Sequence, residues 1–335
     1  MPSSASLLLS AETSTYGFQG RLSSKFPSQL LVDATEICNL ACVHCPHPIF
    51  KKSEHYDGRS VNPELNAKLV DEVRVHGKGH TLYIRYASNG EPLTHPHIYE
   101  MLDYAKRHSG AMVTLTTNGK LMVESRIERL LNAGVDVIDI SLDAFSPEVY
   151  TKVRVGGNLL VTRANVLRLI AFIRERRAST KVVVSYVEQP LNRHETDDFE
   201  RFWKDAGANY VVVRRLHSCS GANPELAEQR RAENDADGPR RPCLYPWERI
   251  VLNARGDLSF CPSDWVHGSF ITDYRTTTIK EVWQGEFYRR LREAHLSNNY
   301  SCHGFCGQCP DWKSTRWPVE GRSYANMMEE FKALE

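Results

Sequence analysis

The sequence has no apolar run as long as the 18 residues or so that a membrane-spanning helix needs. Near the N-terminus, the stretch Leu7–Leu9 is too short for the core of a signal peptide, and no basic residue precedes it. The chain of 335 residues also has a net charge of only +1 and no long basic run. These absences argue against a membrane span, against secretion and against nucleic acid as the main partner, so we expect a cytosolic protein.

Cysteine, in contrast, occurs nine times. In a reducing compartment, clustered cysteines indicate metal ligands rather than disulfides. Cys38, Cys42 and Cys45 form a C-x3-C-x2-C motif. The motif directly follows the strand-like run Leu30–Ala34. Three thiolates on one short loop can hold three irons of a [4Fe–4S] cluster and leave the fourth iron open for chemistry. The alternatives are a zinc site or three buried thiols, although no fourth ligand at zinc-finger spacing lies nearby.

The segment Cys38–Cys45, CNLACVHC, resembles the signature of the radical S-adenosylmethionine (SAM) enzymes. The resemblance implies that the open iron binds the amino and carboxylate groups of SAM. It further implies that the reduced cluster cleaves SAM to methionine and a 5′-deoxyadenosyl radical, which removes a hydrogen atom from the substrate. His44 stands where the family often has an aromatic residue, and the resemblance implies a backbone contact to adenine at this position.

Apolar, β-rich runs alternate with amphipathic segments along the first two thirds of the chain. The six expected strands are Leu30–Ala34, Thr81–Ala87, Met112–Thr117, Val137–Asp143, Lys181–Glu188 and Asn209–Leu216. The expected helices are Pro63–Val75, Ile98–Arg107, Arg126–Ala133, Thr162–Arg176 and Thr196–Ala206. This alternation predicts an α/β fold, a partial (β/α)6 TIM-like barrel, which the resemblance also implies. The chemistry of such a barrel should lie at the carboxyl ends of its strands.

A polar motif follows the second expected strand. Asn89-Gly90-Glu91-Pro92 resembles the G-G-E-P motif of the family, and the resemblance implies that its backbone and carboxylate receive the amino group of SAM. Glycine allows a close approach of the backbone, and a carboxylate suits an ammonium group. The alternative is an ordinary Asn-Gly turn.

Three further segments resemble parts of the SAM site. Thr116–Gly119, which contains Asn118, resembles a T-N-G segment, with a simple turn as the alternative. Ser141 and Asp143 resemble a ribose-contacting strand end, and their alternation predicts that both point to one face. Arg154 stands where relatives often have an arginine near the SAM carboxylate. For Asp143 and Arg154, a helix cap or a surface ion pair is the alternative.

The end of the sixth expected strand supplies the candidate catalytic residues. Of Arg214 and Arg215, only one can face the pocket, and we take Arg215 as the candidate that binds or deprotonates an oxygen-rich substrate. Cys219 could donate a hydrogen atom to a substrate radical, as a spare cysteine does in related epimerases. The alternative is a small buried residue. His217 equally fits a supporting role behind the site.

A second cysteine region follows a polar, charged stretch, 222–242, which is expected to be a linker or a flap. It contains an expected hairpin, Ile250–Asn253 and Asp257–Phe260, and an expected helix, Ile279–Leu296. Two ligands near the hairpin and two from a CxxC loop could complete a second cluster, and these four residues are Cys243, Cys261, Cys306 and Cys309. A four-cysteine zinc site is the alternative, and Cys302 could replace one ligand.

The four cysteines resemble the twitch type of the SPASM-related domains, the short form with one auxiliary [4Fe–4S] cluster. Their intervals resemble those of the aminocyclitol dehydrogenases of the butirosin pathway. The sequence therefore divides into an N-terminal extension (1–27), a radical SAM barrel (28–221), the linker (222–242) and an auxiliary-cluster domain (243–335). SAM and two [4Fe–4S] clusters are the expected cofactors.

We expect an oxidoreductase that takes hydrogen from a carbohydrate-like or aminocyclitol substrate and oxidises an alcohol to a ketone, as in antibiotic biosynthesis. An external one-electron donor such as flavodoxin or ferredoxin would reduce it. Only about 29 residues precede the first expected strand, which favours a small substrate over a leader peptide. The alternatives are an epimerase that uses Cys219 or Cys302, a peptide-modifying enzyme and a zinc-binding regulatory module.

Overall fold

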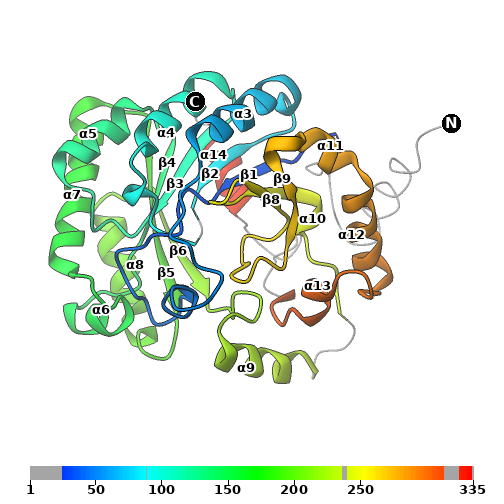
Figure 1. Cartoon of the computed structure of the whole chain (residues 1–335). Helices are drawn as coiled ribbons and strands as arrows, with labels where there is room; N and C mark the ends of the chain where they lie inside the picture. The colour runs from blue at the N-terminus through cyan, green and yellow to red at the C-terminus, as the bar shows by residue number, and fades with distance from the viewer. Residues whose placement is uncertain (1–24, 88, 236–239, 313–323, 334–335) are drawn as a thin grey trace.

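The computed structural model describes residues 25–87, 89–235, 240–312 and 324–333. Six parallel strands form the barrel in chain order (Figure 1), and each pairs with the next. Their bounds are β1 Gln29–Val32, β2 Tyr83–Tyr86, β3 Met112–Thr117, β4 Val137–Ser141, β5 Lys181–Glu188 and β6 Tyr210–Arg215. The expected partial (β/α)6 barrel with a small C-terminal unit is thereby confirmed.

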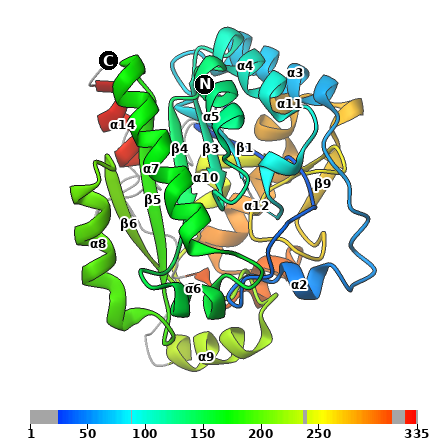
Figure 2. The same ribbon diagram turned by 90° about the vertical axis from the view of Figure 1, so that its left-hand side faces the viewer.

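Helices cover the outer face of these strands (Figure 2). The five expected helices are present as α3 Pro63–Glu72, α4 Ile98–His108, α5 Glu124–Asn132, α7 Leu159–Arg176 and α8 Thr196–Asp205. The first begins as its sequence predicts, since the Asn62 side chain accepts a hydrogen bond from the Glu64 amide and Pro63 takes the first helical position. A π-helical turn, Val73–Gly77, extends α3. Two short helices, α2 His47–Phe50 and α6 Pro147–Val153, were not expected.

The inner face of the barrel is apolar at the amino ends of the strands and polar further along them. At the amino ends, Tyr83, Met112, Val137 and Val183 form an apolar cluster. The C-terminal helix α14, Tyr324–Ala333, closes this end with three buried side chains, those of Met327, Met328 and Phe331. By its contacts, α14 therefore belongs with the barrel, although the sequence placed it in the auxiliary-cluster domain.

The C-terminal unit continues the barrel sheet. Strand β7, Arg249–Leu252, pairs in parallel with β1 from Gln29↔Arg249 to Val32↔Leu252. It then pairs in antiparallel fashion with β8, Asp257–Ser259, which confirms the expected hairpin. A further strand, β9 Phe270–Asp273, was not expected. The sheet thus has nine strands in the order β6-β5-β4-β3-β2-β1-β7-β8-β9.

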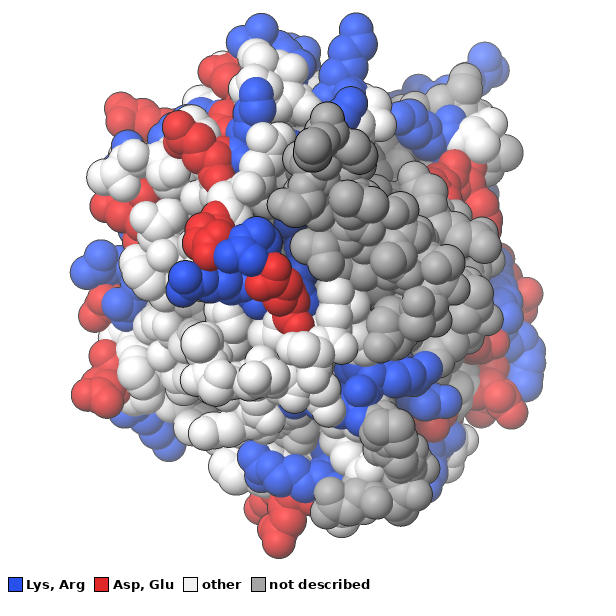
Figure 3. Space-filling view, turned by 90° about the vertical axis from the view of Figure 1, so that its right-hand side faces the viewer, with Lys and Arg blue, Asp and Glu red and all other residues white. Residues whose placement is uncertain are grey.

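The helices of the C-terminal unit are α10 Tyr245–Glu248, α11 Ile279–Gln284, α12 Glu286–Ser297 and α13 Gly304–Gln308. The expected helix Ile279–Leu296 is divided at Gly285, whose extended backbone ends α11 and begins α12. On this side of the molecule, basic and acidic side chains are intermixed (Figure 3). On α12, for example, Arg289 pairs with Glu286 and Glu293.

The expected linker or flap 222–242 contains a helix, α9 Pro224–Asp235. Its sequence is rich in helix formers, and the Asn223 side chain accepts a hydrogen bond from the Leu226 amide at its start. Of the expected N-terminal extension 1–27, residues 1–24 lie outside the described residues. Phe26 is buried in the core. No helix within the described ranges is both long and apolar enough to span a membrane.

Candidate functional site

The first cysteine motif lies on the loop after β1, at the carboxyl end of the barrel strands. Backbone hydrogen bonds from Ala41 and Val43 to the carbonyls of Val155 and Val153 fasten this loop to the end of α6. All three motif cysteines are free thiols. Burial raises the pKa of Cys38 to about 11 and that of Cys45 to about 12. Such thiols ionise only when a metal centre takes the place of the proton, so the loop suits a cluster.

A buried ion pair flanks this loop. Arg154 pairs with Asp143, and its Nη1 atom lies 3.5 Å from the Cys42 sulfur. His44 Nε2 lies 3.4 Å from Asp143 Oδ2, while burial lowers the pKa of His44 to about 4 and keeps the imidazole neutral at pH 7. In addition, the Asp143 carboxylate accepts a 2.7 Å hydrogen bond from the Val187 amide. The ion pair is therefore a buried clamp between the cysteine loop and the strand ends.

The strand alternation from which Ser141 and Asp143 were expected to point to one face does not reach Asp143. Strand β4 ends at Ser141, and Asp143 has a left-handed backbone with φ 60°. The alternation of a strand therefore does not extend to Asp143. Whether these two residues touch a ribose stays a prediction.

The Asn89-Gly90-Glu91 motif packs directly against the cysteine loop. The Glu91 amide donates a hydrogen bond to the Ile37 carbonyl at 2.9 Å. The Glu91 carboxylate itself is buried and accepts hydrogen bonds from the Thr117 hydroxyl (2.6 Å) and the Asn118 amide (2.7 Å). Burial raises the pKa of Glu91 despite these donors. Its carboxylate thus joins two of the expected SAM motifs to each other.

Two polar atoms beside the loop fit a bound polar ligand. Asn118 Nδ2 donates to Asn39 Oδ1 at 2.7 Å, which ties the T-N-G segment to the cysteine loop. Within the part of the chain that the structure describes, Asn39 Nδ2 and Arg154 Nε are buried without a hydrogen-bond partner. Buried donors of this kind usually have a partner. A ligand with carboxylate or hydroxyl oxygens, such as SAM, would provide one.

The barrel interior carries a polar network that the sequence analysis missed. Asp139 of β4 is fully buried and accepts hydrogen bonds from Arg85 of β2 at 3.1 Å and from Arg214 of β6 at 2.7 Å. The Ser185 hydroxyl of β5 donates to the same carboxylate. The sequence did contain a signal for this network, because each of these apolar strands carries a polar residue at a position on the inner face.

This network also corrects the choice between the two arginines of β6. Arg214 points into the barrel, because it reaches Asp139 and Ser185, whereas Arg215 is exposed. Alternation along the strand gives the two side chains opposite directions, but it does not say which of them points inward. Arg214, and not Arg215, is therefore the arginine in position to contact a substrate in the barrel.

The second set of cysteines gathers where the C-terminal unit meets the end of β6. Besides burial, Cys309 and Cys243 raise the pKa of Cys261, and Cys243 and Cys309 raise the pKa of Cys306. Cys302 is exposed. Burial is the largest cause that raises the pKa of Cys306, Cys261 and Cys309, as in the first set.

Arg240 supplies a positive charge beside this second set. Its guanidinium donates hydrogen bonds to the carbonyls of Cys306 (2.6 Å) and Gly307 (3.1 Å) and lies over the Tyr300 ring. The described residues contain no group of three or more His, Cys, Asp or Glu side chains that could hold one metal ion. A [4Fe–4S] cluster spreads four irons over a larger volume, so its ligand thiols lie farther apart than those of a single ion.

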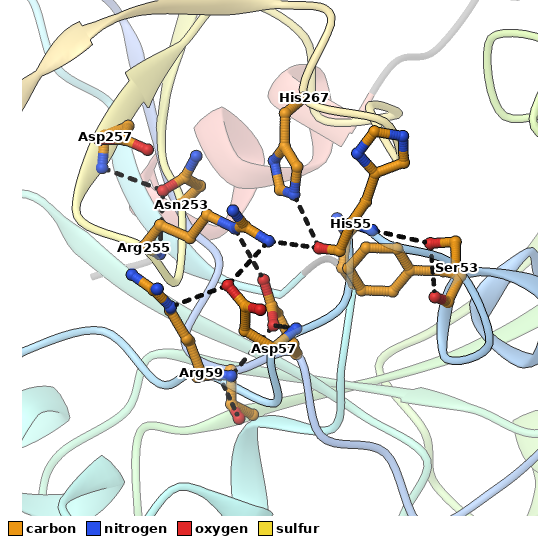
Figure 4. Close-up of polar contacts among 12 residues, drawn as sticks. Ser53, His55, Asp57, Arg59, Asn253, Arg255, Asp257 and His267 are labelled. Carbon is orange, nitrogen blue, oxygen red and sulfur yellow. Dashed lines mark hydrogen bonds and ion pairs between the residues drawn. The ribbon is translucent and has the colours of Figure 1, made fainter.

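A polar cluster ties the chain after α2 to the C-terminal unit (Figure 4). Arg255, in the turn between β7 and β8, donates to the His55 carbonyl and pairs with Asp57 at 3.1 Å. The His267 ring also hydrogen-bonds the His55 carbonyl, at 3.1 Å. Beneath them, the buried Glu36 carboxylate accepts from the Asp57 amide. The two units therefore meet across the segment that directly follows the first cysteine loop.

Comparison with known families agrees with this geometry. Residues 32–202 match the family model described as the Radical SAM superfamily. The chain belongs to the Radical SAM superfamily. Residues 243–310 match a second model, SPASM, described as an iron–sulfur cluster-binding domain. This radical SAM enzyme therefore uses a [4Fe–4S] cluster with SAM and an auxiliary iron–sulfur centre, and the buried thiols and orphaned donors described above fit these groups.

Curated relatives of this radical SAM enzyme include a peptide cyclase and a mycofactocin maturase. The PqqA peptide cyclase of Ruegeria pomeroyi is 26% identical over 257 residues, which cover 74% of this chain and 61% of the relative. Mycofactocin maturase MftC of Mycobacterium ulcerans is 26% identical over 323 residues, 87% of this chain and 82% of the relative. A probable GTP 3′,8-cyclase of Methanococcus maripaludis is 32% identical over 136 residues, 41% of this chain and 43% of the relative. The chain thus spans less than two thirds of the PqqA peptide cyclase and of the GTP 3′,8-cyclase.

Solved structures share the fold of this radical SAM enzyme. SuiB of Streptococcus suis, bound to its precursor peptide SuiA, superposes with a TM-score of 0.63 at 14% identity, over 95% of this chain and 75% of SuiB. BtrN in complex with AdoMet and 2-DOIA superposes with a TM-score of 0.56 at 15% identity, over 85% of this chain and 93% of BtrN. At these identities, the likeness concerns the fold alone.

Proposed function

We propose that this radical SAM enzyme modifies a peptide, in place of the carbohydrate-like substrate expected from the sequence. The observation that carries the proposal is the similarity to the PqqA peptide cyclase over 74% of this chain. The match to mycofactocin maturase MftC covers 87% of the chain, so it includes parts of both the barrel and the C-terminal unit. Relatives that resemble both units are a better guide to the substrate than those that resemble the barrel alone.

The surface around the first cysteine loop supports a peptide as the substrate. Large apolar side chains are exposed on this loop and its neighbours, namely Ile37, Val43, Ile49, Val155 and Val266. Exposed apolar side chains near the loop suit a peptide, because a peptide presents apolar side chains together with polar backbone groups. A small polyhydroxylated substrate offers little apolar surface to them.

The roles of the chain's own residues follow from their positions. Cys38, Cys42 and Cys45 would hold the cluster on which SAM binds. When bound and reduced, this cluster with SAM supplies a 5′-deoxyadenosyl radical that takes a hydrogen atom from the substrate. Arg154 would keep positive charge beside the thiolates. The inward-pointing Arg214 would orient a polar group of the substrate within the barrel.

Oxidation of a small alcohol is the second candidate function. It is favoured by the four cysteines, whose spacing resembles that of the aminocyclitol dehydrogenases and which suffice for one complete auxiliary cluster. Epimerisation would need a hydrogen donor, for which Cys219, a half-buried free thiol just after β6, is the candidate. A Cys219→Ala enzyme that still forms its product normally would exclude this role.

The test uses the full chain, reconstituted with iron and sulfide under anaerobic conditions. SAM cleavage is followed as 5′-deoxyadenosine release with two probes, a set of synthetic peptides and an aminocyclitol alcohol. We expect a peptide of this set to stimulate release at least tenfold, and a deuterium label from that peptide to appear in 5′-deoxyadenosine. Stimulation and label transfer from the aminocyclitol alone would overturn the proposal in favour of the second candidate. Cys38→Ala is the control without activity.

A further inference from the structure

The turn Ser218–Ser220, just after β6, reaches the second set of cysteines through a single hydroxyl group. Ser220 Oγ lies 3.6 Å from the Cys261 sulfur, within the reach of a hydrogen bond to sulfur. A serine hydroxyl has one proton to donate, and a thiolate is an acceptor only. Ser220 is thus placed to donate to Cys261, one of the four expected cluster ligands.

The backbone of the same turn is unusual. Cys219 and Ser220 both have left-handed backbones, with φ values of 54° and 59°. Two consecutive residues other than glycine in this region are energetically unfavourable and persist only when their surroundings hold them. The turn therefore depends on contacts with the rest of the fold to keep its form.

Asp311, two residues after Cys309, holds the turn in this form. Its carboxylate accepts hydrogen bonds from the Ser218 amide (3.0 Å), the Ser218 hydroxyl (2.7 Å) and the Ser220 amide (2.8 Å). Ser218 is fully buried. These contacts anchor the turn to the CxxC loop, and they fix the Ser220 hydroxyl relative to the ligands on that loop.

We propose that Ser220 tunes the auxiliary cluster by donating a hydrogen bond to the sulfur of its ligand Cys261, and so raises the reduction potential of that cluster. A hydrogen bond to a ligand sulfur withdraws negative charge, which favours the reduced and more negative cluster. Ser220 is a positioning residue in this role, because it acts through the ligand. The inference rests on the assignment of Cys261 as a ligand of the auxiliary cluster.

The experiment measures the potential of the auxiliary cluster alone. In the full chain, Cys38, Cys42 and Cys45 are replaced by alanine, so that one cluster remains for redox titration followed by EPR. Ser220→Ala and Ser220→Gly both remove the hydroxyl, while glycine alone relieves the left-handed backbone. We expect both variants to lower the ratio of reduced to oxidised cluster about tenfold at a given potential, a downward shift of about 59 mV for one electron.

A control substitution beside Cys302 distinguishes a failure of the proposed role of the Ser220 hydroxyl from a failure of the ligand assignment. Ser301 Oγ lies 3.9 Å from the sulfur of Cys302, the exposed cysteine outside the assigned ligand set. Ser301→Ala should leave the potential unchanged. A shift in Ser301→Ala without a shift in the Ser220 variants would mean that Cys302 is a ligand, and the ligand assignment would fail. An unchanged potential in all variants, or a shift in Ser220→Ala alone, would overturn the role of the hydroxyl.

If the Ser220 variants fail to hold the cluster, a second measurement on the protein with Ser220 intact tests whether its hydroxyl donates to the cluster. In the same one-cluster protein with Ser220 intact, proton ENDOR spectra of the reduced cluster are recorded in H2O and in D2O. Backbone amides exchange as well, but hydrogen-bonded amides exchange more slowly than a hydroxyl, so a coupled proton that is already lost when the sample is frozen seconds after transfer to D2O supports a hydroxyl donor. The absence of such a proton would contradict it.

Discussion

Gly90 lies where two loops of the site cross with no room for a side chain. A Cβ atom there would come within 2.1 Å of the Thr35 carbonyl oxygen and 2.6 Å of the Ile37 carbonyl oxygen. Since both obstacles are backbone, Gly90→Ala must displace the loop that carries Glu91. We expect a loss of about 2 kcal/mol in the free energy of unfolding, together with weaker SAM binding in a calorimetric titration.

Gly304→Ala provides the comparison for this substitution. A Cβ atom at Gly304 meets nothing within 4 Å, so the change should alter stability by less than about 0.5 kcal/mol. Equal losses in Gly90→Ala and Gly304→Ala would contradict the close approach at Gly90.

Arg214 and Arg215 are neighbours with opposite surroundings, and they should respond differently to the same substitution. Arg214→Met removes one of the two arginines that compensate the buried Asp139 carboxylate. We expect it to cost about 2 kcal/mol in urea unfolding, because part of a buried charge loses its partner. Arg215→Met, at an exposed position, should cost less than about 0.5 kcal/mol. The reverse order would restore Arg215 as the residue in the barrel.

His95 should make stability depend on pH. It is buried, its Nε2 atom donates to the Val61 carbonyl at 2.9 Å and its Nδ1 atom accepts from the His97 amide at 3.0 Å, so the ring is neutral. Burial lowers its pKa in the folded protein. Below about pH 6.5 the unfolded chain then binds more protons than the folded one, and stability falls as the pH decreases.

The measurement is the urea midpoint at pH 7.5 and at pH 5.5. His95→Gln removes the ionisable group and should give a smaller decrease between these two values than the unaltered protein. The exposed His108 on α4 supplies the control, since His108→Gln should leave the decrease unchanged. An identical decrease in all three proteins would exclude His95 as the cause.

At the scale of elements, the sequence predicted the strands and helices of the barrel well. Runs such as Val182–Val184 are buried on both faces of a parallel sheet, so their composition alone indicates a strand. The polar residues inside the barrel were harder to assign. Asp139 interrupts an apolar strand, and the sequence does not show that Arg85 and Arg214, far away along the chain, pair with it.

The second cysteine unit was only partly predictable, for physical reasons specific to each element. Gly285 divides α11 from α12, whereas apolar periodicity continues across it. Strand β9 is short, with one exposed and three half-buried side chains, and therefore lacks a clear alternating pattern. Helix α9 is polar and has few apolar residues to signal burial, yet Ala227 is buried.

Helix α14 should stabilise the barrel rather than the auxiliary cluster. Met328 is fully buried against the amino ends of the barrel strands. Met328→Ala is expected to cost about 3 kcal/mol of unfolding free energy, because it leaves a cavity under the sheet, while iron per chain stays constant. The exposed Lys332 on the same helix is the control, with Lys332→Ala close to neutral. A loss of iron without a loss of barrel stability would assign α14 to the C-terminal unit instead.

For the whole molecule, the iron and sulfide content shows how many iron–sulfur clusters one chain holds. Two [4Fe–4S] clusters predict about eight irons and about eight acid-labile sulfides per reconstituted chain. Replacement of Cys243 and Cys261 together should reduce both to about four, since the first set of cysteines is on another loop. Cys302→Ser should leave about eight, because Cys302 is exposed and outside the assigned set. About four irons in the unaltered protein would exclude a complete auxiliary cluster.

The parallel pairing of β1 with β7 has a practical consequence for anyone who wishes to study the barrel by itself. Expression of residues up to 242 alone would remove β7 and leave Gln29–Val32 as a bare sheet edge. Such an edge, apolar and with unpaired amides and carbonyls, is a template for intermolecular strand addition. We expect the shortened protein to aggregate even with its SAM motifs intact, so that the smallest workable fragment of this enzyme contains both iron–sulfur units.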